Sequence, residues 1–228
     1  VFTSTILANL IVNKKVTLDT PIQEILELKF ANSTTIKLIN LANHTSGLPR
    51  QPPNMNWLND SDNPYKKYSE EKLLEYLKDE VLLNKTLKGN YEYSNLGMGL
   101  LGYLLTRATN LKYEELLIKN VFSKYKMTNS TSKIEKVKKS LVHGLSPTGK
   151  KVSNWDFDVL VGAGGILSST KDLATFTKAN FYLENTELTL THKPTFTIND
   201  TIKLGLGWHL PTIQKNNNLL FHNGGTGG

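Results

Sequence analysis

Apolar residues recur three and four positions apart along most of the chain, which is the spacing of one face of an α-helix. Phe2, Ile6 and Leu10 already share such a face, in a helix with no capping residue before Val1. The same spacing predicts further helices over residues 70–83, 96–109, 112–122 and 171–183. The pattern therefore predicts a mainly helical chain.

Short polar side chains mark the ends of three of these helices. Ser69 and Asn95 each precede a predicted helix, and Ser169 or Thr170 precedes the last one. Such side chains accept hydrogen bonds from the free N–H groups of a first turn. Asn110 follows the helix predicted over 96–109, where a left-handed residue is expected to end it.

Strand patterns appear only late in the chain. Residues 201–210 and 217–225 are short apolar segments, bounded by Pro211, an asparagine run and glycines. A single hairpin is only marginally stable alone. We therefore expect the partners of these strands to lie outside the sequence.

Composition and charge narrow the class of protein. The chain has 228 residues, 39% of them hydrophobic and 21% charged, and it can bury a full core. Its net charge of +7 suits nucleic acid, but only Arg50 and Arg107 are arginines, and the lysines are scattered. We therefore expect no nucleic-acid partner. The apolar start is interrupted by Thr3 and Asn9, so no membrane span is expected either.

Several chemistries lack their residues. The chain has no cysteine, and its five histidines do not fall at a paired ligand spacing, so no metal site is expected. The glycines of 162–165 lack the lysine of a phosphate-binding loop. Nucleophilic serine chemistry is what remains.

Serine hydrolases without a Ser-His-Asp triad often use Ser-x-x-Lys, with the lysine one helical turn after the serine. The chain contains three such pairs, Ser123 with Lys126, Ser130 with Lys133, and Ser168 with Lys171. None opens a long apolar helix in which burial would lower the pKa of the lysine. We therefore expect none of these serines to be the nucleophile.

Five segments, in family order and over almost the whole chain, resemble signatures of the class C β-lactamase-like serine hydrolases. They are LANHTSGLPR (41–50), YSNLGMGLLGYLL (93–105), GAGGILSSTKDLATF (162–176), LGLGWHL (204–210) and HNGGTGG (222–228). This family also holds D-alanyl-D-alanine carboxypeptidases, D-amino-acid peptidases and carboxylesterases. The resemblance implies an α+β fold of the β-lactamase/transpeptidase type, of which this chain carries mainly the helical region.

The resemblance also implies how the chain is divided. It suggests a single truncated domain, with residues 1–19 as core helix and turn, 20–203 as the mostly helical region, and 204–228 as the return to the sheet. In the family, the lysine of Ser-x-x-Lys is followed by one residue and then Phe-Thr. Here Phe2-Thr3 follows Val1. The catalytic lysine is therefore expected directly before Val1 and the serine three residues earlier, outside this chain.

Tyr93 and Asn95 match the family's Tyr-x-Asn element. The resemblance makes the tyrosine a general base towards the serine and an acid towards the leaving group, with its pKa lowered by nearby positive charge. It makes the Asn95 amide a partner of the substrate's acyl-side amide. The alternative is that Asn95 only caps a helix and Tyr93 only packs.

His222 stands where relatives carry either His-x-Gly or Lys-Thr-Gly. A histidine there is not a permanent cation near neutral pH, which favours esterase or peptidase chemistry over β-lactam recognition. After it, Gly224 and Gly225 are expected to bind substrate, with the Gly225 N–H in the oxyanion hole. His44 is interpreted as part of a structural turn, and the glycines of 162–165 as a cleft rim.

The resemblance implies a serine hydrolase that acts through an acyl-enzyme on small esters, amides or D-amino-acid peptides, without a cofactor. It implies a bacterial protein of the periplasm or cell surface. The alternatives are a β-lactamase or D-Ala-D-Ala carboxypeptidase proper, or a non-catalytic ligand-binding homologue. A Ser-x-x-Lys motif ending just before Val1 would favour the enzyme.

Overall fold

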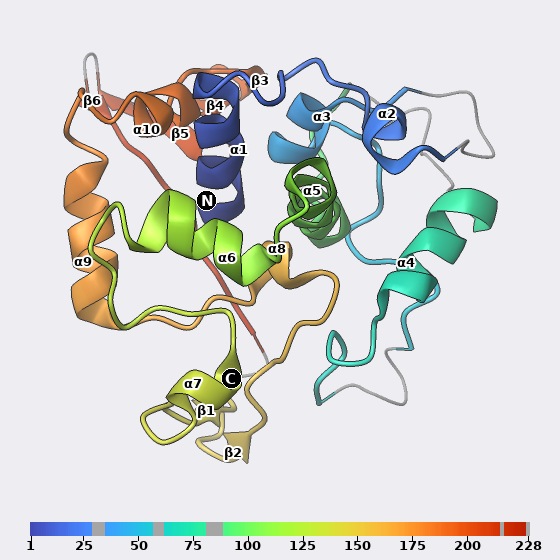
Figure 1. Cartoon of the computed structure of the whole chain (residues 1–228). Helices are drawn as coiled ribbons and strands as arrows, with labels where there is room; N and C mark the ends of the chain where they lie inside the picture. The colour runs from blue at the N-terminus through green and yellow to red at the C-terminus, as the bar shows by residue number, and fades with distance from the viewer. Residues whose placement is uncertain (29–34, 57–61, 81–88, 215–216, 227–228) are drawn as a thin grey trace.

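Helices packed around a central helix, with a small sheet to one side, make up the molecule (Figure 1). The structure is a computed structural model that describes residues 1–28, 35–56, 62–80, 89–214 and 217–226. The central helix is α1 (Phe2–Val12), whose residues Thr3 to Ala8 are all buried. Burial on every side explains why its polar residues are short threonines and a serine.

The remaining elements follow in chain order. The helices are α2 (Ile22–Leu26), α3 (Leu38–Ala42), α4 (Glu70–Glu75), the π-helix η1 (Tyr76–Glu80), α5 (Asn95–Thr109), α6 (Tyr113–Leu117), the π-helix η2 (Ile118–Phe122), α7 (Ile134–Val137), α8 (Val161–Gly164), α9 (Thr170–Ala179) and α10 (Thr186–Thr191). The strands are β1 (Gly144–Leu145), β2 (Lys151–Val152), β3 (Phe196–Asn199), β4 (Ile202–Leu204), β5 (His209–Gln214) and β6 (Asn217–Asn218).

The helix predicted over 96–109 forms as α5 and packs closely on its neighbours. α5 ends at Asn110, which adopts the left-handed conformation with φ 55°. Gly102 of α5 lies against Gly162 of α8, and a Cβ on Gly102 would stand 2.9 Å from the Gly162 Cα. The two glycines therefore allow the backbones of α5 and α8 to touch.

Other predicted helices differ in their lengths. The segment 70–83 forms α4 and then η1, and its residues 81–83 lie outside the described residues. The segment 112–122 likewise changes from α6 to η2. The helix predicted over 171–183 ends at Ala179, because the side-chain amides of Asn180 and Asn185 donate to the last carbonyl groups.

The prediction that the late strands lack partners in this chain is wrong. β3, β4, β5 and β6 form an antiparallel sheet in that order, so it starts at Phe196, earlier than the predicted 204. The segment 201–210, predicted as one strand, contains β4, a turn and the start of β5. Gly207 turns the chain with φ 71°, and a side chain at Gly205 would overlap the Thr191 carbonyl oxygen.

The last predicted strand, 217–225, is also shorter than expected. Asn217–Asn218 form β6, and Phe221 pairs with His209 through an isolated bridge. Residues 222–226 pair with no strand in the described part of the chain. They run instead along the edge of a cavity.

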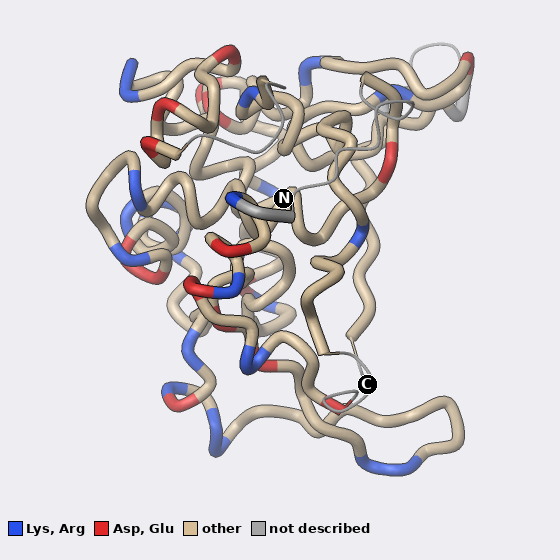
Figure 2. Tube along the Cα trace, turned by 90° about the vertical axis from the view of Figure 1, so that its right-hand side faces the viewer, with Lys and Arg blue, Asp and Glu red and all other residues tan. Residues whose placement is uncertain are grey.

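Basic residues are spread along the chain rather than gathered on one element. Figure 2 shows Lys and Arg positions on many segments, interleaved with acidic ones. Within the described residues, no helix is both long and apolar enough to cross a lipid bilayer. No group of three or more potential ligands there is placed to hold a metal ion.

Candidate active site

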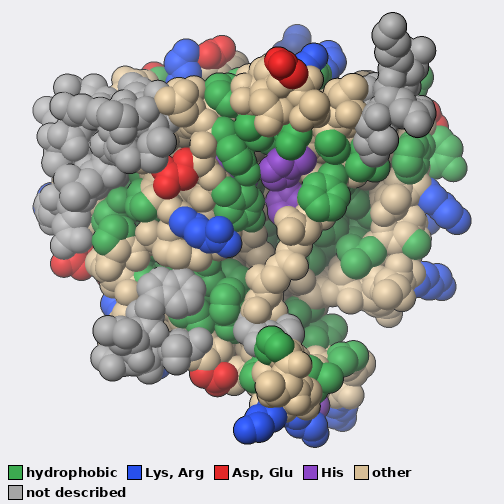
Figure 3. All heavy atoms as spheres, turned by 180° about the vertical axis from the view of Figure 1, so that it is seen from behind, with side chains coloured by type: hydrophobic (Ala, Val, Ile, Leu, Met, Phe, Trp, Pro, Cys, Tyr) green, Lys and Arg blue, Asp and Glu red, His purple; other side chains and the backbone are tan. Residues whose placement is uncertain are grey.

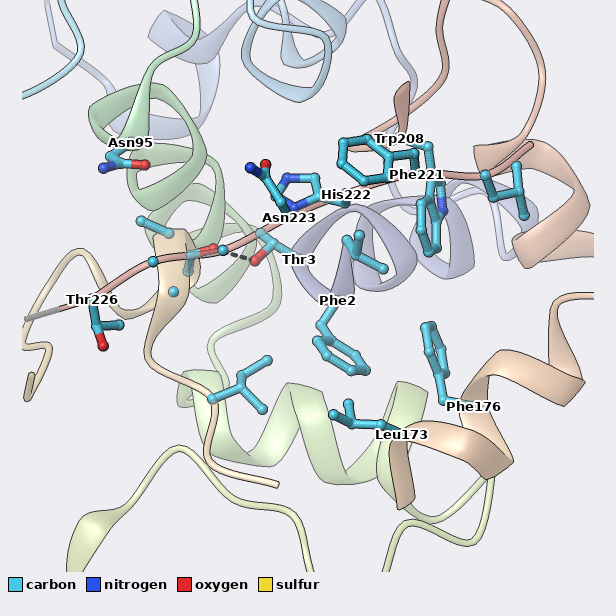
Figure 4. Close-up of a pocket in the computed structure, with 18 of the residues that line it drawn as sticks. Phe2, Thr3, Asn95, Leu173, Phe176, Trp208, Phe221, His222, Asn223 and Thr226 are labelled. Carbon is cyan, nitrogen blue, oxygen red and sulfur yellow. Dashed lines mark hydrogen bonds between the residues drawn. The ribbon is translucent and has the colours of Figure 1, made fainter. Parts of the chain in front are cut away.

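A cavity of about 700 Å³ opens where the first turn of α1, the start of α5, α8, α9 and residues 219–226 meet. Figure 4 shows two kinds of wall. Phe2, Leu173, Phe176 and Trp208 give an apolar side, Asn95 stands at the opposite end, and His222 lies between them. Such a mainly apolar cavity with few polar groups is typical of a small-molecule site.

The structure brings every sequence-predicted site residue to this one cavity. Its walls include Tyr93, Asn95, His222, Gly224 and Gly225. Val1, Gly162 and Gly164 also line it, whereas Gly165, the third glycine of the predicted cleft rim, does not. The chemical roles of these residues stay predictions.

Tyr93 lies in the loop before α5 and is half-buried. Its ring centroid is 4.5 Å from that of His44 and 6.3 Å from that of His222. The Arg50 guanidinium carbon lies over the ring, 5.5 Å from its centroid. The phenol is thus surrounded by residues from two segments distant in sequence, 41–50 and the one that contains His222.

His44 supports the Tyr-x-Asn segment through hydrogen bonds with its backbone. It is buried with φ 58°, and its Nδ1 accepts the N–H of Ser94, 3.1 Å away. Its carbonyl oxygen accepts the N–H of Glu92 at 2.9 Å. Burial lowers the pKa of His44 to about 3, so the ring remains a neutral acceptor at neutral pH.

Asn95 is not the helix cap that its position suggested. Ser94 caps α5, since its hydroxyl accepts the N–H of Gly97 at 2.8 Å. The Asn95 amide is therefore free to reach sideways, and it donates to the Tyr65 hydroxyl at 2.9 Å. Tyr65 donates in turn to Gln51 at 2.7 Å. Sequence reasoning missed Tyr65, because no local pattern links it to Asn95.

His222 is neutral in its surroundings. Burial lowers its pKa to about 4. Its ring lies 6.1 Å from that of His209, whose Nε2 is 3.0 Å from the Tyr91 hydroxyl. The expectation that His222 is not a fixed cation is consistent with this environment. Tyr91 and His209 were not predicted.

The pKa of Tyr93 differs from its expected direction. Burial raises it, and the positive charge of Arg50 opposes that rise only in part. The resemblance implied a lowered pKa for Tyr93, and the described residues do not produce one. A cation closer to the phenol than Arg50 would be required.

Gly224 and Gly225 line the cavity, but nothing in the described structure crowds them. A Cβ on either would meet no heavy atom within 4 Å. The close strand approach expected at Gly225 is therefore not visible among the described residues.

The three Ser-x-x-Lys serines do not line this cavity. Ser130 donates to Asp172 at 2.7 Å and lies 2.7 Å from the Ser168 hydroxyl. Next to them, Ser169 caps α9 by accepting the N–H of Asp172. Ser130 and Ser168 thus belong to the cap of a helix.

Comparisons with known proteins identify the family of this chain. The sequence profile of the Beta-lactamase family matches residues 1–228, and the chain belongs to that family. A curated relative, Beta-lactamase-like protein 2 of Dictyostelium discoideum, is 36% identical over 106 residues, 46% of this chain and 18% of the relative.

Solved structures share the fold at low sequence identity. A β-lactamase/D-alanine carboxypeptidase from Pseudomonas syringae has a TM-score of 0.77 at 19% identity, covering 94% of this chain and 59% of that one. A class C β-lactamase has 0.76 at 23%, covering 93% and 58%. An octameric penicillin-binding protein homologue from Pyrococcus abyssi has 0.72 at 19%, covering 92% and 51%. The fold is β-lactamase/transpeptidase-like, and this chain spans a little over half the length of these structures.

Proposed function

We propose that the protein containing this chain is a serine hydrolase that acts through an acyl-enzyme on esters, amides or D-amino-acid peptides. The observation that carries this proposal is the convergence of Tyr93, Asn95 and His222 on one cavity at the start of α1. Family membership supports a hydrolase in general terms. The nucleophile in this proposal is a Ser-x-x-Lys serine in residues that precede Val1.

The proposed mechanism assigns the proton transfers to Tyr93 and the stabilisation of the oxyanion to the Gly225 N–H. The serine hydroxyl attacks the acyl carbon while its proton passes to Tyr93, directly or through the lysine. Tyr93 then protonates the leaving group as its bond to the acyl carbon breaks. Water attacks the acyl-enzyme, again losing a proton to Tyr93, and the proton returns to the serine as the acid leaves. The Gly225 N–H stabilises the oxyanion in both steps.

Because the pKa of Tyr93 is raised, the proposal requires the lysine of Ser-x-x-Lys as well as the serine. A buried phenol beside only one distant guanidinium is a weak base at neutral pH. An ammonium group directly before Val1 would lie at the end of α1 that lines the cavity. Its charge would favour the phenolate.

Two alternatives have specific support. The named relatives of known structure include a β-lactamase/D-alanine carboxypeptidase, which favours those activities for this fold. The raised pKa of Tyr93 favours a ligand-binding homologue without turnover. The neutral His222 counts against strong recognition of a β-lactam carboxylate at that position.

Hydrolysis of p-nitrophenyl acetate by the protein containing this chain tests the proposal. Tyr93→Phe removes only the phenol oxygen and should lower kcat by about 100-fold or more, the usual scale of a proton-transfer residue. Tyr182→Phe is the matched control, since Tyr182 is 55% exposed and does not line the cavity. Equal activities of wild type and Tyr93→Phe would overturn the proposed role.

A further inference from the structure

The cavity has no charged side chain in its walls. Its described lining contains no Lys, Arg, Asp or Glu. Its titratable side chains are Tyr65, Tyr93 and His222, and His222 is neutral near pH 7. Recognition of an ionic substrate group would therefore have to come from the rim.

Arg50 does not line the cavity, but its backbone holds it next to Tyr93, which does. Its carbonyl oxygen accepts the N–H groups of Asn95 at 3.0 Å and Leu96 at 3.2 Å, at the start of α5. These two bonds fix the position of residue 50 relative to Tyr93 and Asn95. The side chain is exposed, and its guanidinium carbon stands 5.5 Å from the Tyr93 ring centroid.

This guanidinium has no acidic partner among the described residues. None of the ion pairs found there includes Arg50. Its charge reaches the cavity nonetheless, because it lowers the pKa values of Tyr65, Tyr91 and Tyr93 against the larger effect of burial. Figure 3 shows histidine side chains at the bottom of a hollow, with basic side chains on the same face.

We propose that Arg50 binds a carboxylate carried by the leaving group of the substrate. The inference rests on the proposed function, in which Tyr93 protonates the leaving group. The leaving group is the part of the substrate that Tyr93 protonates, and the guanidinium carbon of Arg50 lies 5.5 Å from the centroid of the Tyr93 ring. The planar guanidinium offers paired N–H donors that match the two oxygens of a carboxylate.

This position differs from that of the His222 strand. His222 belongs to the segment after β6, and the centroid of its ring is 6.3 Å from that of Tyr93. Arg50 comes from the turn after α3. Its backbone is bonded to the start of α5, and its guanidinium lies near the Tyr93 ring. The site therefore selects substrates by where their carboxylate is attached, and not only by whether they carry one.

A matched pair of esters tests this specificity. 4-Acetoxybenzoate and 4-acetoxybenzamide have the same acyl group and leaving groups of nearly the same shape, and only the first is an anion. We expect Arg50→Gln to lower the ratio of their kcat/KM values by about fivefold, the upper range for an exposed ion pair. Arg50→Lys should keep part of the ratio, and about 1 M NaCl should reduce it in the wild type.

Arg107→Gln is the control, because Arg107 is the other arginine of the chain, is also exposed and lies in the last turn of α5. It should leave the ratio unchanged. If Arg50→Gln lowers both esters equally, Arg50 only supports the Tyr93 ring, and the inference is overturned. An unchanged ratio overturns it as well.

Binding separates failure of this inference from failure of the proposed function. Calorimetric titration with 4-hydroxybenzoate and 4-hydroxybenzamide requires no turnover. If the wild type hydrolyses neither ester, the hydrolase proposal fails, and the titration still decides about Arg50. Wild type that prefers the anion, with the preference lost in Arg50→Gln, supports the inference, and equal affinities contradict it.

Discussion

At the scale of single residues, the chemistry of the site depends on which side chains are kept neutral. His44 and His222 are both shifted towards the neutral form by burial. His44 needs that state, since a protonated Nδ1 could not accept the Ser94 N–H. Burial therefore keeps both histidines neutral near pH 7: His44, which positions the Tyr-x-Asn segment, and His222, which lines the cavity.

The pH dependence of stability reports on His44. Its pKa is lowered from 6.5 to about 3 in the folded chain, so the unfolded chain binds its proton more readily. The free energy of unfolding contributed by His44 is complete above pH 6.5 and is lost as the pH falls towards 3, at up to about 1.4 kcal/mol per pH unit.

Urea denaturation between pH 7 and about pH 4 measures this slope. In His44→Asn, whose side chain can accept the same N–H and tolerates a positive φ, the slope should be smaller than in the wild type. Identical slopes in the two proteins would show that His44 is not held neutral by the fold.

His222→Lys should change substrate preference. It adds a fixed cation facing the cavity, and a hydrogen bond to a charged partner is worth about 1.5–3 kcal/mol. We expect kcat/KM for a cephalosporin to rise relative to p-nitrophenyl acetate by roughly one to two orders of magnitude. A wild type that already prefers the cephalosporin, or an unchanged ratio in the variant, would count against the assigned role of His222.

At the scale of elements, the site depends on how closely α8 approaches α5 and α1. The Gly162 carbonyl oxygen accepts the Thr3 hydroxyl at 2.6 Å, which ties α8 to the first turn of α1. Gly162 also lies against Gly102 of α5. Gly162 therefore both lines the cavity and joins α8 to α1 and α5.

Gly162→Ala should destabilise the fold by about 1–3 kcal/mol, the usual cost of overpacking. Its Cβ would stand 2.9 Å from the Gly102 Cα and 3.0 Å from the Met98 carbonyl oxygen, both of which are backbone atoms. Gly224→Ala, with nothing within 4 Å, should change stability little. Urea unfolding of the two variants compares them directly, and equal stabilities would contradict this account of the α5–α8 contact.

Elements were predictable where the signal was local and long. α5 could be predicted from its apolar stripe and from Asn110, but its cap was placed one residue late, because Ser94 and Asn95 are both good capping residues. β3 was not predicted, since four residues carry too little periodicity. The break between β4 and β5 depends on the contact of Gly205 with the Thr191 carbonyl, which the sequence does not display.

At the scale of the molecule, the family signatures could be predicted to meet, and the cavity brings four of them together. Tyr65 and Arg50 could not be assigned in advance, because their approach to Asn95 and Tyr93 depends on how the chain between α3 and α4 folds back on the start of α5. The chain spans 51% to 59% of the solved structures that it matches. Activity is therefore a property to test on the protein that contains this chain.

Mapping a covalent adduct tests the central claim most directly. The protein containing this chain is treated with a fluorophosphonate, digested, and analysed by peptide mass spectrometry. The account predicts one stoichiometric adduct, on a serine in the residues before Val1, and none within residues 1–228. An adduct on Ser123, Ser130 or Ser168, or no labelling at all, would contradict it.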